Sequence, residues 1–219
     1  EPRALDSEID FILGTAGRYL VRMPGRDDIL CIFAGLRPLA ADPANPGSTR
    51  EISRRHKIII SRSGLLSIVG GKWTSYRRMA EETIDRGIKA GMLPYRKCVT
   101  RNLKLYDNNQ VLKAERLKIY GNRAKEIENM TDEDPELGVR ISSKLPYTRA
   151  EIIWICRNEM PLTLEDMLAR RTRALILDAR ASREMAPETA RLMAGEMGFD
   201  EKWVTEQTNA YGQLIESYL

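Results

Sequence analysis

Residues 67–77 read SIVGGKWTSYR, and the pattern changes at the glycine pair inside this stretch. Before the glycines, residues 57–61 and 65–69 are apolar runs on either side of Arg62-Ser63-Gly64, which predicts a two-stranded hairpin. After the glycines, apolar residues recur every three or four positions, which predicts a helix that begins at Thr74 or Ser75. The stretch therefore predicts a strand, a glycine turn and a helix start in direct succession.

This turn carries the chemistry of an anion-binding site. Gly70 and Gly71 allow the backbone to turn tightly and a ligand to approach its amides, while a helix N-terminus offers unpaired N–H donors and a partial positive charge. Lys72 adds a full positive charge that suits a phosphate, a carboxylate or the negative charge of a reduced flavin. The spacing is not that of a Walker motif. The alternative interpretation is a structural turn with an exposed lysine.

Two further segments place arginines beside predicted strands. The apolar run at residues 28–34 predicts a buried strand, and Arg37 follows it, fixed between Leu36 and Pro38. A guanidinium in such a place can present two parallel donors to an oxyanion, although a structural ion pair explains it equally well. Residues 51–57, EISRRHK, form a basic entry into the next strand, which is also typical of a solvated edge.

The segments outside this region predict helices. Residues 6–19 have helical spacing up to about Gly17, and i,i+4 ion pairs are expected in the helix after the glycine turn, at Glu82/Arg86 and Asp85/Lys89. Beyond Pro94 strand alternation ends. Helix starts are then predicted from a capping box at Thr148 and Glu151, from Thr163 with Asp166, from Pro187 as a first helical residue and from Asp200 as a cap. We expect an α+β fold with a boundary near residue 98.

Composition excludes several classes of protein. With 219 residues, 42% hydrophobic and 30% charged, the chain is expected to fold, and no apolar run is long enough to span a bilayer. Three cysteines without a CxxC pair and a single histidine argue against a disulfide framework and against a metal site, and favour a reducing compartment.

The net charge of +4 is unevenly distributed: residues 1–98 carry 17 basic and 11 acidic side chains, and residues 99–219 carry 18 and 20. A basic half can serve nucleic acid, an anionic membrane surface or a phosphorylated small molecule. The arginine cluster at residues 170–173 lies near Asp166, Asp178 and Glu184 in the acidic half, so we do not expect a nucleic-acid partner.

Four segments in this order resemble the C-terminal part of the FAD-dependent glycerol-3-phosphate dehydrogenases of the aerobic, quinone-linked type. They are AGLRPL at residues 34–39, ISRRHKI at 52–58, VGGKWTSYRRMAE at 69–81 and ARRTRALILDAR at 169–180. The resemblance implies that residues 1–98 are the remnant of a mixed-sheet FAD/substrate-binding domain. It also implies that residues 99–219 are an all-α C-terminal domain.

The resemblance implies a role for each matching residue. Arg37 and Lys72 resemble residues of the active site that bind the substrate, and Arg54 resembles a substrate-binding arginine beside it. The residues that resemble the loop against the flavin ring are Gly70, Gly71, Lys72, Trp73 and Thr74. The implied reaction is hydride transfer from C2 of sn-glycerol 3-phosphate to N5 of FAD, which gives dihydroxyacetone phosphate. Electrons then pass to quinone, and the implied location is cytoplasmic, peripheral on the inner face of the cytoplasmic membrane.

One departure limits what the chain is expected to do alone. No GxGxxG fingerprint occurs in these residues, and the histidine expected as the general base would lie upstream. The first residue is Glu1 rather than a methionine. We therefore expect a fragment that neither binds FAD tightly nor turns over.

Two other functions fit the same residues. A flavin oxidase of the amino-acid or amine type would use the arginine for a substrate carboxylate, although the helical half argues against it. Residues 99–219 could instead form a helical interaction module that binds a partner protein or the membrane surface.

Overall fold

The computed structural model describes residues 2–36, 55–104 and 112–219, and the chain forms two compact units. One unit contains Glu1–Gly35 and Tyr106–Leu219, and the other contains Leu36–Leu105. The boundary expected near residue 98 falls inside the second unit, and residues 1–35 associate with the helices rather than with the hairpin. The assignment of the two parts to a FAD/substrate-binding domain and a helical C-terminal domain stays a prediction.

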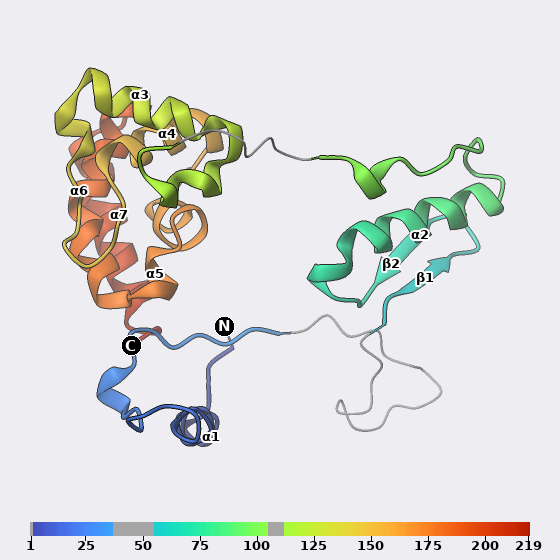
Figure 1. The fold of residues 1–219 in the computed structure, drawn as a ribbon, viewed down its shortest axis with the longest axis horizontal. Coiled ribbons are helices and arrows are strands. Elements are labelled where there is room, and N and C mark those ends of the chain that lie inside the picture. Colours follow the sequence, from blue (N-terminus) through green and yellow to red (C-terminus); the bar gives the residue numbers. More distant parts are fainter. Residues whose placement is uncertain (1, 37–54, 105–111) are drawn as a thin grey trace. The chain divides into compact units, whose positions relative to one another are not determined.

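The smaller unit is built on the predicted hairpin (Figure 1). Strand β1 (Lys57–Ile60) pairs antiparallel with β2 (Leu66–Val69), with Lys57 opposite Val69. A 3-10 turn at Trp73–Ser75 leads into helix α2 (Tyr76–Lys89), and a second 3-10 turn covers Thr100–Asn102. Helix α2 packs on β2, so hairpin, glycine turn and helix follow one another as the sequence predicts.

The larger unit is helical. Its helices are α1 (Asp6–Gly17), α3 (Ala124–Glu133), α4 (Arg149–Glu159), α5 (Ala174–Leu177), α6 (Ala179–Met197) and α7 (Glu201–Ile215). Helix α6 packs against both α4 and α7 (Figure 1). Shorter turns are 3-10 helices at Arg26–Asp28, Glu115–Arg123 and Pro135–Gly138 and a π-helix at Asp166–Arg171. The core lies between these helices and includes the fully buried Ile152, Ile155, Leu168, Leu175, Met185, Met193 and Ile215.

Three of the predicted helix starts are confirmed. The amide of Thr148 donates to Glu151 at 3.0 Å, and the two residues form a capping box. The Thr163 hydroxyl accepts from the amide of Asp166 at 3.0 Å, and Asp200 accepts from the amide of Trp203 at 2.8 Å. These side chains satisfy N–H groups that the first helical turn leaves without partners.

The expectation for Pro187 is wrong. Helix α6 runs from Ala179 to Met197 with Pro187 inside it, and its cap is Asp178, which accepts from the amide of Ala181 at 2.9 Å. A proline removes one helical hydrogen bond. The helix continues because buried residues on both sides of the proline, including Met185 and Met193, anchor one face of it in the core.

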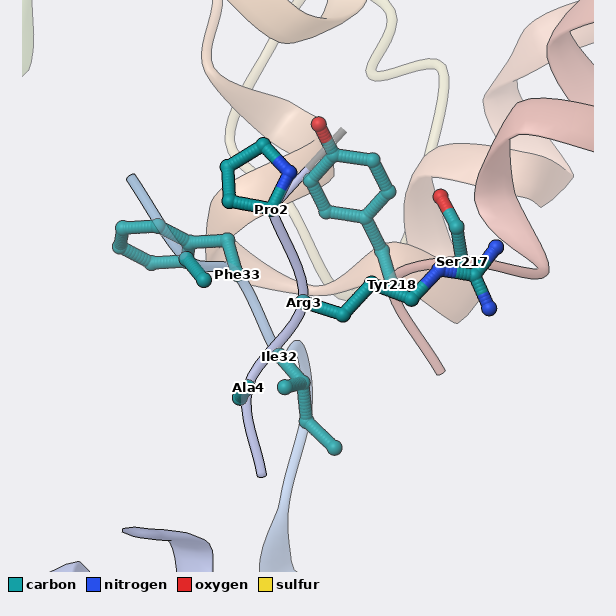
Figure 2. A pocket seen from close by; sticks show the side chains of 8 residues that line it. Pro2, Arg3, Ala4, Ile32, Phe33, Ser217 and Tyr218 are labelled. Carbon is teal, nitrogen blue, oxygen red and sulfur yellow. The ribbon is translucent and has the colours of Figure 1, made fainter. Parts of the chain in front are cut away.

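The predicted strand at residues 28–34 is also wrong. Asp28 ends a 3-10 turn, and residues 29–34 form neither a helix nor a strand and pair with no strand among the described residues. Its backbone bonds to the segment after α7 and to the start of α6 instead: the Ile32 amide donates to the Tyr218 carbonyl at 2.9 Å, and the Ala179 amide donates to the Leu30 carbonyl at 3.0 Å. A small cavity of about 30 Å³ is lined here by residues 2–4, 32–34, 217 and 218 (Figure 2). A strand needs a neighbouring strand, and an apolar run does not supply one.

The α+β class with a mostly helical C-terminal part is confirmed. Among the residues that the structure describes, no helix has both the length and the apolar character to cross a membrane.

Candidate functional site

The glycine turn lies between the end of β2 and the start of α2. Gly70 has φ 74° and Gly71 has φ 87°, so both lie in the left-handed region that other residues rarely adopt. Two successive residues of this kind reverse the chain within a very short distance. The local sequence therefore needs glycine at both positions.

Gly71 is also needed because of its neighbours. A Cβ atom placed on Gly71 would lie 2.6 Å from Sδ and Cε of Met79 and 3.1 Å from Cβ of His56. Met79 comes from α2, and His56 is the residue before β1. The turn is therefore enclosed on one side by the helix and by the first strand of the hairpin.

The helix side of the turn presents the N-terminal end of α2, which a 3-10 turn precedes. The Lys72 carbonyl accepts from the Ser75 amide at 3.0 Å and from the Ser75 hydroxyl at 2.9 Å, which tightens the chain before α2. The first N–H groups of a helix have no acceptor within the helix, and the helix dipole makes this end positive. α2 is 14 residues long, which is long enough to develop this potential.

Charge pairing at the start of α2 engages two arginines and leaves Lys72 available. Arg77 pairs with Glu81 at 2.8 Å, and Arg78 pairs with Glu82 at 2.7 Å. These guanidinium groups hold the pKa of both carboxyls below the usual value, and His56 lowers that of Glu82 further. Lys72 is exposed and makes no ion pair with any residue that the structure describes. The turn therefore carries a net positive charge.

The ion pairs on α2 differ from the expected ones. Glu82 binds Arg78 rather than Arg86, and no Asp85/Lys89 pair forms among the described residues. Glu82 can pair with an arginine four residues before or after it. Nε2 of His56 lies 2.8 Å from Oε2 of Glu82 and holds the carboxylate towards the N-terminal end of α2.

Trp73 and Thr74 complete the turn, and both are exposed. Trp73 is 88% exposed, and its ring stacks on that of Tyr76 with 5.9 Å between ring centroids. An exposed pair of stacked rings next to the start of α2 offers a flat apolar surface beside the glycine turn.

The structure thus brings together five of the predicted site residues in one turn, Gly70 to Thr74. Arg37 and Arg54 lie outside the described residues. The sequence did not single out Met79, Glu82 or His56 for this site. One signal was available: Lys57 opposite Val69 in the hairpin puts residue 56 next to residue 70.

The turn can bind an oxyanion. Glycine amides, a helix N-terminus and one unpaired ammonium are the usual components of a phosphate site, and they also suit the electron-rich edge of a flavin ring. The donors therefore fit either group. Among the described residues, no cluster of three or more histidine, cysteine, aspartate or glutamate side chains could hold a metal ion.

Comparisons with known proteins show the family to which the chain is similar. Residues 62–204 match the family model described as the C-terminal domain of alpha-glycerophosphate oxidase. The chain is 36% identical to the probable mitochondrial glycerol-3-phosphate dehydrogenase of Caenorhabditis elegans over 90% of its own length and 30% of that protein. It is 34% identical to the human mitochondrial glycerol-3-phosphate dehydrogenase, over 94% of this chain and 31% of that one.

A solved structure has the same fold. The glycerol-3-phosphate dehydrogenase from Bacillus halodurans, complexed with FAD, aligns with a TM-score of 0.72 and 25% identity, over 100% of this chain and 46% of that chain. The chain spans about 30% of the length of the curated relatives named above. The family match covers the hairpin's second strand, the glycine turn, α2 and most of the helical unit. The chain therefore belongs to the family of the C-terminal domain of alpha-glycerophosphate oxidase.

Proposed function

We propose that this chain is the C-terminal part of an FAD-dependent sn-glycerol-3-phosphate dehydrogenase, and that its glycine turn forms one side of the active site. The observation that carries the proposal is the exposed turn at residues 70–74 with the unpaired Lys72, in a chain that aligns along its whole length with an FAD-bound dehydrogenase. The chemistry that FAD supplies when bound is acceptance of a hydride from C2 of glycerol 3-phosphate, which gives dihydroxyacetone phosphate.

The residues of this chain bind and orient in that reaction. The amides of the turn and the Lys72 ammonium stabilise negative charge, either on the substrate phosphate or on the ring edge. Trp73 and Thr74 are both exposed and border the ring. Arg37 supplies a bidentate contact to the substrate, and Arg54 assists it. The histidine base comes from residues upstream of this chain.

The proposal includes a limit. Without a GxGxxG turn, the chain has no motif for the pyrophosphate of FAD, so the isolated chain binds FAD weakly and does not turn over. Titration of the isolated chain with FAD, followed by flavin fluorescence, tests this. Saturation at nanomolar FAD would contradict it.

The route of the electrons is part of the proposal. Quinone accepts them, and the protein lies in the cytoplasm, peripherally on the inner face of the cytoplasmic membrane. The excess of basic residues in 1–98 supports contact with an anionic lipid surface. Flotation with anionic and with neutral vesicles tests this, and equal recovery with both would contradict the electrostatic contact.

A chimera tests the catalytic proposal directly. Residues 1–219 replace the matching part of the Bacillus halodurans enzyme, and the purified chimera is assayed for bound flavin and for dye reduction driven by glycerol 3-phosphate. We expect flavin in the chimera and dye reduction that depends on the substrate. A folded, flavin-loaded chimera that is inactive with glycerol 3-phosphate but active with an amine or amino acid would overturn the substrate assignment.

A further inference from the structure

We infer that His56 and Glu82 form a positioning pair that fastens the first strand of the hairpin to α2 across Gly71, and so fixes the turn that carries Lys72. The imidazole Nε2 lies 2.8 Å from Oε2 of Glu82. His56 is only 19% exposed, and its Cβ lies close to Gly71. The geometry of the turn is independent of the proposed function, whereas the effect on substrate binding rests on it.

The direction of the hydrogen bond follows from the charge of Glu82. Arg78 binds the other carboxylate oxygen, Oε1, at 2.7 Å, and Arg78 and His56 together hold the pKa of Glu82 below its usual value. The carboxylate is therefore ionised at neutral pH and can only accept. His56 must donate from Nε2, in a hydrogen bond to a charged acceptor, which is stronger than one between neutral groups.

The position of this bond makes it a fastening for the turn. His56 precedes β1 and Glu82 lies in the second turn of α2, so the bond closes a ring of chain that includes both strands and residues 70–75. Gly71 is enclosed by this ring, because His56 and Met79 fill the space beside its Cα. If the bond is lost, the hairpin can separate from α2 at the point where Lys72 leaves the turn.

The pair also keeps the site positive. Glu82 is one of two carboxylates near the N-terminal end of α2, and its charge opposes that of Lys72 there. His56 and Arg78 occupy both of its oxygens. Glu81 is bound to Arg77 in the same way. Both carboxylates are thus paired with other cationic or hydrogen-bonding side chains, and Lys72 remains available for an anion.

The first part of the test measures how firmly the hairpin beside the turn is held in the 219-residue chain. Hydrogen exchange of the paired backbone amides of β1 and β2 is followed by NMR in His56→Leu, Glu82→Gln and the double variant. Loss of a hydrogen bond to a charged group is expected to raise exchange about tenfold in each. The double variant should match the singles because they remove one shared interaction.

Two variants provide controls. His56→Gln keeps an amide donor near the position of Nε2, so it should restore exchange to within about threefold of wild type. Asp85→Asn removes an exposed acid from the same helix that has no ion pair with a described residue, so it should leave exchange unchanged. The intact strand amide resonances of Ile58–Ile60 verify that each variant is folded. Unchanged exchange in folded His56→Leu and Glu82→Gln, or additive effects in the double variant, would overturn the positioning pair.

The second part measures kinetics in the chimeric dehydrogenase described above. A positioning role predicts a KM for glycerol 3-phosphate about tenfold higher in His56→Leu, with kcat changed less than about twofold and recovery in His56→Gln. Faster exchange with an unchanged KM would uphold the positioning pair but contradict the phosphate role proposed for Lys72. The two failures are therefore distinguishable.

Discussion

Replacing Gly71 by alanine tests the geometry of the turn most sharply. The backbone φ of 87° costs a residue with a Cβ about 1–2 kcal/mol. The new methyl group would lie 2.6 Å from the end of the Met79 side chain and 3.1 Å from the His56 Cβ. Met79 can rotate away, whereas the His56 Cβ can move only with its backbone, so crowding adds about 1 kcal/mol. We expect the smaller unit to lose about 2–3 kcal/mol of unfolding free energy.

Two control variants separate the strain from the crowding. Gly91 has φ 72° and nothing within 4 Å of its added Cβ, so Gly91→Ala should cost only about 1–2 kcal/mol. Met79→Ala should lower the free energy of unfolding less in the Gly71→Ala variant than in the wild type, because the new methyl group fills part of the space left by the Met79 side chain. Urea unfolding followed through the NMR signals of β1 and β2 measures the stability of this unit separately from the helices. Equal losses in Gly71→Ala and Gly91→Ala would refute the crowding argument.

Three further predictions concern the helical unit. Glu151→Gln should lower the free energy of unfolding of this unit by about 2 kcal/mol, because the Glu151 side chain is 1% exposed and binds Arg116. Thermal unfolding measures this, and a loss below about 0.5 kcal/mol would contradict it. Burial raises the pKa of Glu128, but hydrogen bonds from Lys125 and from two backbone amides outweigh it, and the pKa lies below the usual 4.5. The stabilisation that ionised Glu128 provides is therefore complete above pH 4.5 and is lost as the pH falls through the lower pKa of the folded protein. The urea midpoint of Glu128→Gln should therefore depend less on pH between pH 6 and 3 than that of the wild type. Burial raises the pKa of Cys156 to about 11, so in variants that each keep one cysteine this thiol should react slowest with Ellman's reagent at pH 8, and equal rates would contradict the burial.

The sequence was sufficient where structure depends on near neighbours. The hairpin at residues 57–69, the start of α2 and the caps at Thr148 and Asp200 follow from local alternation, turn residues and side-chain acceptors. The turn at Gly70 and Gly71 was predicted for the same reason, because two glycines between a strand and a helix indicate an unusual backbone. These features need no information about distant parts of the chain.

The sequence was insufficient where contacts between distant segments determine the local structure. The apolar run at residues 28–34 has the composition of a strand, but its backbone partners are Tyr218 and Ala179, far along the chain. Pro187 looks like a helix start, yet burial of the residues around it carries α6 through the proline. The choice of Glu82 between Arg78 and Arg86 was set by His56, which the fold brings from another element.

The candidate site was predicted in part. Residues 70–74 were identified from their chemistry, and the structure places them in one exposed turn. The hairpin puts His56 beside Gly70, but the packing of Met79 and the His56–Glu82 contact could be seen only once the packing of α2 was known. The roles proposed for Arg37 and Arg54 still rest on sequence, because both lie outside the described residues.

The central claim is that Lys72 binds an anionic group in the active site, and substitution of Lys72 in the flavin-loaded chimera tests it most directly. Lys89→Met is the matched control, because Lys89 is exposed like Lys72 but is the last residue of α2, at the end of the helix away from the turn. We predict that Lys72→Met lowers kcat/KM for glycerol 3-phosphate about 30-fold or more, the equivalent of one hydrogen bond to a charged group, while Lys89→Met stays within about twofold of wild type. Equal kinetics for Lys72→Met and Lys89→Met, with the same flavin content, would contradict the account.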